Sequence, residues 1–142
     1  MSALQLHPQA AASLQRWHAM VAARDLGALP ELLAPAALFR SPMAHTPYPG
    51  AAVVSTILNT VLQVFEDFVY HRELATADGL SVVLEFSARV GERQLKGIDM
   101  IRFDEQGLIR EFEVMVRPMS GLAALGEEMG RRLAPYLAAM KG

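Results

Sequence analysis

Asp99 is the residue whose setting in this sequence points most directly to chemistry. It lies within Leu95–Phe103, where side chains alternate between two faces of a predicted strand. Lys96 and Arg102 mark one face as the wetter one, so Asp99 belongs to the apolar face. A carboxyl group buried without a partner raises its pKa, and the neutral acid can then donate a hydrogen bond or exchange a proton near neutral pH. The alternative is a structural aspartate, held by a backbone amide or by a buried arginine or histidine.

Two further candidates lie in the loop predicted by the three prolines between Ser41 and Gly50. His45 and Tyr48 lie in this loop, where they could form the rim of a pocket. Both are candidate catalytic residues. The alternative for His45 is an ordinary solvated loop histidine. His18 is expected at the edge of the core, and His71 is expected to point outward.

Metal and cofactor motifs are missing from the sequence. It has no cysteine, no cluster of histidine and carboxylate residues at metal-ligand spacing, and no glycine-rich phosphate loop. We therefore predict neither a metal nor a cofactor.

The composition is that of a globular protein: of 142 residues, 52% are hydrophobic and 20% are charged. A formal net charge of −2 gives no reason to expect nucleic acid or a membrane surface as a partner. No apolar run approaches the roughly 20 residues that span a bilayer.

Met1–Gln9 lacks the pattern of a secretory signal, and the absence of cysteine is typical of the cytoplasm, which is the location we expect. Excess apolar surface in a small protein goes into a ligand cavity or an oligomer interface, and we expect both here.

The spacing of apolar residues changes along the chain, and this change predicts the helices and strands that position these residues. Apolar spacings of three and four predict helices, and from Phe68 onward a period of two predicts strands. The predicted helices are Ala10–Arg24, Leu26–Leu33, which Pro35 stops, and Ala51–Phe65, with a short extended piece at Ala37–Arg40. Strands follow around Leu80–Ala88, Gln94–Asp104 and Leu108–Arg117. A last helix begins near Ser120, with Leu125, Leu133 and Leu137 on its apolar side and Pro135 expected to bend or end it. This order predicts one α+β domain over residues 1–142, with helices packed on one side of an antiparallel sheet.

The segment Gly97–Ile109 resembles a pattern of the nuclear transport factor 2-like superfamily. That pattern is Ile-Asp, two apolar residues, Arg-Phe-Asp, a turn ending in glycine, and an apolar strand, matched here from Ile98-Asp99 to Ile109. The likeness is nearer to the ketosteroid isomerase and SnoaL-like polyketide cyclase branches. It implies a cone-shaped, strongly curved antiparallel sheet with helices on its concave side, enclosing a deep pocket (a cystatin-like α+β roll).

The resemblance also implies roles for individual residues. Asp99 falls on the isomerase's oxyanion-hole aspartic acid, which an apolar site keeps protonated. Trp17 stands where the isomerase has a tyrosine, and Ser41, before Pro42, stands where it has its catalytic base. Because two of three residues are replaced, ketosteroid isomerisation itself is not expected. Polyketide cyclases use a pocket aspartate helped by a histidine, which Asp99 with His45 would approximate.

Two functions are consistent with these residues. The first is a cofactor-independent acid–base enzyme, such as an isomerase, cyclase or hydrolase, acting on a small apolar molecule. The second is a non-catalytic ligand-binding or dimeric scaffold protein, and a core filled by Trp17 and the methionines would favour a purely structural dimer. The predicted pocket is lined by Trp17, Ser41, Val82, Leu84, Phe86, Leu95, Gly97, Ile101, Phe112, Val114 and Val116. We expect a homodimer through the outer sheet face, which carries Val83, Ile98, Met100 and Met115.

Overall fold

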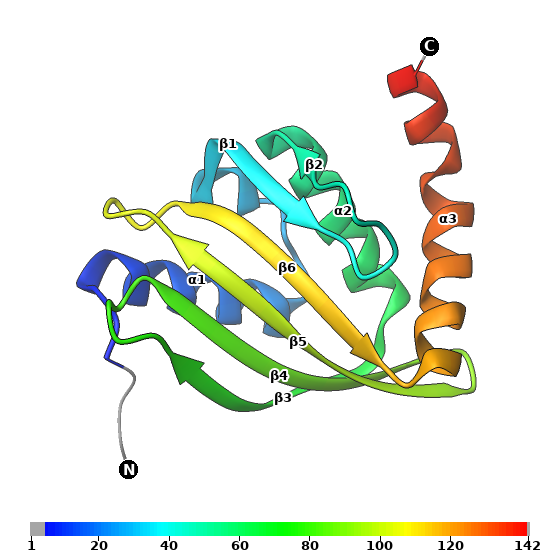
Figure 1. Cartoon of the computed structure of the whole chain (residues 1–142), viewed down its shortest axis with the longest axis horizontal. Helices are drawn as coiled ribbons and strands as arrows, with labels where there is room; N and C mark the ends of the chain where they lie inside the picture. Colours follow the sequence, from blue (N-terminus) through cyan, green and yellow to red (C-terminus); the bar gives the residue numbers. More distant parts are fainter. Residues whose placement is uncertain (1–4, 142) are drawn as a thin grey trace.

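Helices and strands follow one another along the chain in the order that the change of period predicts (Figure 1), except that the segment predicted as a loop contains a two-residue strand, Tyr48–Pro49. The computed structural model describes residues 5–141, with side chains as far as residue 136. Its elements are α1 (Pro8–Ala23), the short 3-10 helix η1 (Leu29–Leu32), β1 (Leu33–Arg40), β2 (Tyr48–Pro49), α2 (Ala51–Val64), β3 (Glu66–Ala75), β4 (Ser81–Val90), β5 (Arg93–Phe103), β6 (Ile109–Arg117) and α3 (Met119–Lys141).

The six strands form one sheet in the order β2-β1-β6-β5-β4-β3. All neighbouring strands are antiparallel except β1 and β6, which run parallel, so the sheet is mixed where the sequence predicts an antiparallel one. The difference arises because α2 and four strands separate β1 from β6 in the chain, and such long connections permit parallel pairing. The α+β architecture is confirmed, and strands β3 and β4 bend along their length (Figure 1).

Two prolines have weaker effects than the sequence predicts. The helix expected at Leu26–Leu33 is a single 3-10 turn, and Pro35 lies inside strand β1. The strand accepts it because its register with β6 shifts between Leu33 and Leu38, where a ladder hydrogen bond is not required. Pro135 does not end α3, which continues to Lys141. The side chain of Leu137, expected on the apolar side of this helix, lies outside the described residues.

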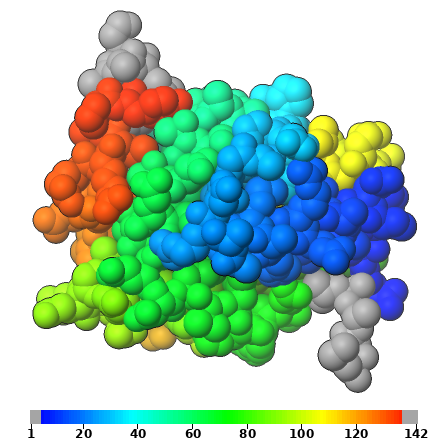
Figure 2. Space-filling view, turned by 180° about the vertical axis from the view of Figure 1, so that it is seen from behind, coloured from blue at the N-terminus to red at the C-terminus, as the bar shows by residue number. Residues whose placement is uncertain are grey.

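The helices cover one face of the sheet and leave the other open. In Figure 1 the sheet lies in front of α1 and α2, with α3 beside its end, and Figure 2, seen from behind, shows α1 and α2 in front. The core lies between these layers, with Val82, Leu84 and Phe86 of β4 completely buried. Within the described part of the chain, no helix is long and apolar enough to cross a membrane.

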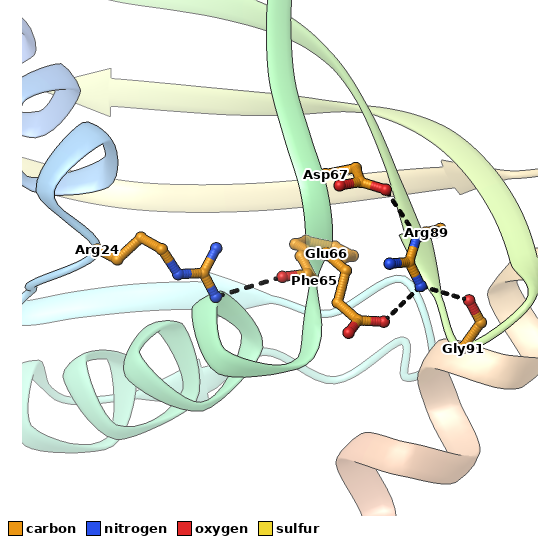
Figure 3. A network of polar contacts seen from close by, with 6 residues as sticks. All are labelled: Arg24, Phe65, Glu66, Asp67, Arg89 and Gly91. Carbon is orange, nitrogen blue, oxygen red and sulfur yellow. Dashed lines mark hydrogen bonds and ion pairs between the residues drawn. The ribbon is translucent and has the colours of Figure 1, made fainter.

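A network of arginine contacts fixes the junction between α2 and β3 (Figure 3). Arg24, just after α1, donates to the carbonyl oxygens of Leu62 and Phe65 at the end of α2, over 2.8 and 3.4 Å. Arg89 of β4 donates to the carboxylates of Asp67 and Glu66, over 2.7 and 2.8 Å. These contacts hold the first residues of β3, and β3 in turn positions the aromatic side chains that follow Asp67.

Candidate active site

A cavity of about 180 Å³ lies between the helices and the inner face of the sheet. Most of its wall is apolar, and its polar side chains are few: Trp17, Ser41, Tyr48, Tyr70 and Asp99. The remaining lining residues are Val21, Leu26, Phe39, Pro42, Met43, Ile57, Leu58, Val61, Leu62, Phe65, Phe68, Phe112, Val114, Leu125, Gly126, Met129, Gly130 and Leu133. A concave, largely apolar space with a few convergent polar groups is the usual form of a small-molecule site.

Asp99 lies on the wall of this cavity and is 6% exposed. It sits on the central strand β5, between Leu84 of β4 and Val114 of β6, both of which are buried. The period-two alternation therefore places this residue on the buried face, as the sequence predicts.

Two side chains from distant parts of the chain hold the carboxyl group. The hydroxyl of Tyr70 on β3 donates a hydrogen bond of 2.5 Å to Asp99 Oδ2. The same hydroxyl oxygen accepts a hydrogen bond of 3.0 Å from the indole Nε1 of Trp17 on α1. The result is a chain of donors that runs from Trp17 through Tyr70 to Asp99.

Burial controls the protonation of this chain. Removal from water raises the pKa of Asp99 to about 7, against the smaller, opposing effect of the Tyr70 hydrogen bond. Burial, followed by the neighbouring Asp99 charge, raises the pKa of Tyr70 well above its ordinary value. Tyr70 therefore stays neutral, and Asp99 is the group that can gain or lose a proton near neutral pH.

Glu85, the other buried acidic side chain among the described residues, contrasts with Asp99 in its partners and its pKa. Glu85 points to the outer face of the sheet, where Arg72 binds it through two hydrogen bonds of 2.8 and 2.9 Å and Lys96 lies 3.3 Å away. The hydrogen bonds from Arg72 are the main cause that lowers the pKa of Glu85 to about 2. Glu85 is thus a permanently ionised structural residue, whereas Asp99 has no cationic partner among the described residues.

The structure brings together only some of the residues predicted for the site. Asp99, Trp17, Ser41, Tyr48, Phe112 and Val114 all line the cavity. The other predicted lining residues, which do not line it, are Val82, Leu84, Phe86, Leu95, Gly97, Ile101 and Val116. They belong to the packed part of the sheet face or, in the case of Val116, lie beside it.

Aromatic packing explains why the cavity stops short of Gly97. Phe65, Phe68 and Phe86 contact one another, with ring centroids 5.0 to 5.5 Å apart, and fill the space beside β4. A Cβ atom on Gly97 would lie 2.7 Å from Phe86 Cζ, so the ring occupies the position of a side chain at that residue. Near the start of β5, Leu95 packs against Gly121 of α3 instead of facing a cavity.

The structure does not bring His45 to Asp99. His45 is exposed and is not among the cavity-lining residues. The backbone N–H of Met43 donates to Ser41 Oγ over 3.0 Å, which forms a tight turn at the start of the loop. Ser41, Met43 and Tyr48 line the cavity, and His45 lies at the exposed part of the loop between them.

Tyr70 is the candidate site residue that sequence reasoning missed. Outward placement of His71 implies, by alternation, that its neighbour Tyr70 points inward. The structure shows this arrangement, since His71 is exposed and contacts Ser87 of β4. The signal was present in the sequence, but nothing in it indicated that the hydroxyl meets Asp99.

No group of three or more histidine, aspartate or glutamate side chains suited to a metal ion occurs within the described residues.

Comparisons with known proteins agree with this architecture. The family model of the SnoaL-like domain matches residues 14–112. A crystal structure of a steroid delta-isomerase from Pseudomonas aeruginosa is 74% identical, with a TM-score of 0.93 over 96% of this chain and 99% of that one. An uncharacterised protein with a cystatin-like fold from Silicibacter pomeroyi is 33% identical, with a TM-score of 0.82 over 95% and 92% of the two chains.

More distant structures share the fold alone. An NTF2-like protein of unknown function from Mesorhizobium loti is 16% identical, with a TM-score of 0.69 over 79% of this chain and 93% of that one. No curated protein shows significant similarity to this chain. Because the family model matches most of its length, this chain belongs to the SnoaL-like domain family.

Proposed function

We propose that this protein is an isomerase-type acid–base enzyme that needs no cofactor and acts on a small, neutral, largely apolar molecule carrying an oxygen. The observation that carries the proposal is Asp99, a carboxyl group in an apolar cavity whose pKa burial raises to about 7. A group with this pKa can both take and return a proton at neutral pH, which is what an isomerisation requires.

The hydrogen bonds of Asp99 support this role. Tyr70 binds Oδ2, and among the described residues no hydrogen bond reaches Oδ1, which leaves that oxygen to a bound molecule. In the ionised state Asp99 would take a proton from a carbon next to a carbonyl group. The C–H bond breaks, its electron pair moves into the enolate, and the carboxylic acid then returns the proton to another carbon. Trp17 and Tyr70 hold the carboxyl group in place during both steps.

The mechanism differs from the one that the isomerase resemblance implies. Ser41, at the position of the isomerase base, accepts a hydrogen bond from Met43 and has no basic partner among the described residues. Asp99 would therefore act as the base itself. The similarity to a protein described as a steroid delta-isomerase supports isomerase chemistry, and it does not by itself assign a steroid as the substrate.

Hydrogen–deuterium exchange tests the proposal without knowledge of the natural substrate. The full chain is incubated in D₂O with cyclohexanone, and exchange at the carbons next to the carbonyl is followed by NMR. We expect exchange above the buffer rate, rising with pH to a plateau above about 7 as Asp99 ionises. Asp99→Asn should lower this rate by about 10² to 10⁴-fold, as is typical for loss of a general base.

A matched control is Glu92→Gln, which removes a carboxylate from the turn between β4 and β5 and should leave exchange unchanged. Exchange that is equally fast with the wild type and with Asp99→Asn would overturn the proposal.

A non-catalytic ligand-binding protein is the second candidate. The observation that favours it is the lack of a second base: apart from Asp99, the polar groups on the cavity wall are hydroxyls and an indole. This function predicts that Asp99→Asn changes only the affinity for ligand, with no exchange above the buffer rate in either protein.

The cytoplasm is the location we propose, on the cysteine-free composition alone. Cell fractionation with an antibody to the protein would test it, and recovery outside the cytoplasm would contradict it.

A further inference from the structure

We propose that this site takes neutral molecules of one ring, and that Met43, lying over Gly126, sets the size limit at the cavity mouth. The inference rests on the proposed function only in using the same cavity. It names the class of molecule that the cavity admits, whether or not the bound molecule reacts.

The volume of the cavity is the first argument. At about 180 Å³ it is close to an engineered apolar cavity of ~150 Å³ that binds benzene. Sites for larger ligands measure roughly 300 to 1,000 Å³. One ring with a small substituent fills this space, whereas a fused four-ring skeleton would have to extend through the mouth.

The charge of the wall is the second argument. No lysine, arginine or histidine is among the described residues that line the cavity, and Asp99 is its one carboxyl group. An anionic ligand would therefore be buried beside Asp99 without a cation, which is strongly unfavourable. The polar groups at Asp99 suit a single carbonyl or hydroxyl oxygen, and the apolar wall suits the hydrocarbon part of the molecule.

The mouth of the cavity is the third argument. The loop between β1 and β2 extends toward α3, as Figure 1 shows, and Met43 of this loop is 53% exposed although it lines the cavity. A Cβ atom on Gly126 of α3 would contact Cε of Met43 and lie 2.8 Å from its Sδ. The thioether therefore lies directly on the helix at Gly126 and partly closes the cavity from outside.

Gly130, one turn further along α3, lies at the same mouth of the cavity. It lines the cavity and is also exposed, and a Cβ atom there would meet nothing within 4 Å. Glycine inside a helix is less favourable than alanine. The two glycines leave a gap along α3 that Met43 fills only at Gly126.

A series of enones with increasing ring number tests the size limit. Cyclohex-2-enone, a two-ring octalone and the four-ring androst-4-ene-3,17-dione present the same reactive group on larger skeletons. Trp17 is the single tryptophan of the chain and lies on the cavity wall, so its fluorescence reports binding directly. We expect saturable quenching by cyclohex-2-enone, and at least tenfold weaker binding of the two larger compounds.

Substitution of the methionine tests how the limit is set. Met43→Ala should strengthen binding of the two-ring enone at least tenfold and change that of cyclohex-2-enone little. Because Met43 is exposed, the variant should keep its fold, which circular dichroism can verify. Met119→Ala is the matched control, since Met119 is 85% exposed and does not line the cavity.

The outcomes separate this inference from the proposed function. Binding of the four-ring compound as tightly as cyclohex-2-enone overturns the size limit, even if proton exchange still depends on Asp99. Unchanged selectivity in Met43→Ala overturns the role of that residue. Ring-size selectivity with no dependence of exchange on Asp99 supports the inference and overturns the proposed function.

Discussion

The hydroxyl of Tyr70 on β3 reaches across strand β4 to donate a 2.5 Å hydrogen bond to Asp99 on β5. The backbone of Tyr70 is paired with Phe86 of β4, and the two rings pack edge to face, with centroids 6.5 Å apart. The tyrosine thus passes beside a completely buried phenylalanine to reach the carboxyl group. A hydrogen bond in this buried position affects both the stability of the protein and the dependence of that stability on pH.

The raised pKa of Asp99 predicts how stability depends on pH. In the folded protein this pKa is about 7, and in the unfolded chain it is near 3.8. Between these values the folded state binds more protons than the unfolded one, so the free energy of unfolding falls as pH rises from about 4 to 7. The total loss is on the order of 4 kcal/mol, from 1.36 kcal/mol per pKa unit.

Asp99→Asn should remove this loss. The difference in unfolding free energy between the variant and the wild type, measured with urea, should grow in favour of the variant from pH 4 to pH 8. Glu92→Gln, at the hairpin turn, should show no such growth. A constant difference across this range would mean that Asp99 is already ionised at pH 4.

Removal of the Tyr70 hydroxyl should affect both of its neighbours. In Tyr70→Phe, Trp17 Nε1 loses its acceptor and Asp99 loses its donor. Loss of a partner from a buried polar group costs about 1 to 3 kcal/mol. Because the Tyr70 hydrogen bond lowers the pKa of Asp99, that pKa should rise further in the variant, as NMR titration of the carboxyl carbon can measure. Tyr48→Phe is the control, since Tyr48 lines the cavity but does not bind Asp99; an equal shift there would contradict the assignment.

The packing of Gly97 predicts a large effect from one added methyl group. In Gly97→Ala the new Cβ atom would lie against the carbonyl oxygen of Met115 and 2.7 Å from Phe86 Cζ. Overpacking of this kind costs about 1 to 3 kcal/mol. Gly130→Ala is the opposite case, because its Cβ meets nothing and alanine favours the helix by up to about 1 kcal/mol. Thermal unfolding should therefore show a lower Tm for the first variant and an equal or higher Tm for the second. Similar Tm values for both would show that β5 can shift to make room.

The open face of the sheet predicts self-association. Val83, Ile98 and Met100 are only half-buried there, and Leu74 and Met115 are exposed. Charges on this face are paired within the sheet, as in Arg72 with Glu85 and Arg102 with Glu111, so two copies would not repel each other strongly. We propose a homodimer through this face, and light scattering should give the mass of two chains.

Ile98 lies near the centre of this face, between Glu85 of β4 and Met115 of β6. Ile98→Lys should therefore shift the mass toward one chain, whereas Gln106→Lys, in the turn between β5 and β6, should not. A wild-type mass of one chain would contradict the dimer.

The sequence by itself determined which residues face inward. Alternation along β5 placed Asp99 among apolar side chains, because a strand with one buried face repeats every two residues. The same rule predicted the strands β4 to β6, and the spacing of apolar residues predicted the helices, since these signals are local. The inward position of Tyr70 also follows from the sequence, because its neighbour His71 is expected to point outward.

Only the tertiary structure decided what each inward-facing residue meets. Trp17 and Tyr70 are 53 positions apart in the chain, and Tyr70 and Asp99 are 29 apart. Such pairings depend on how the strands order themselves and on which volumes are already filled. Phe86 fills the space over Gly97, and the cavity that Asp99 lines has Met43 and residues of α3 on its wall. The local spacing of apolar residues specifies which face of a strand or helix is buried. A cavity and its hydrogen bonds arise instead from packing between elements that are distant in the sequence.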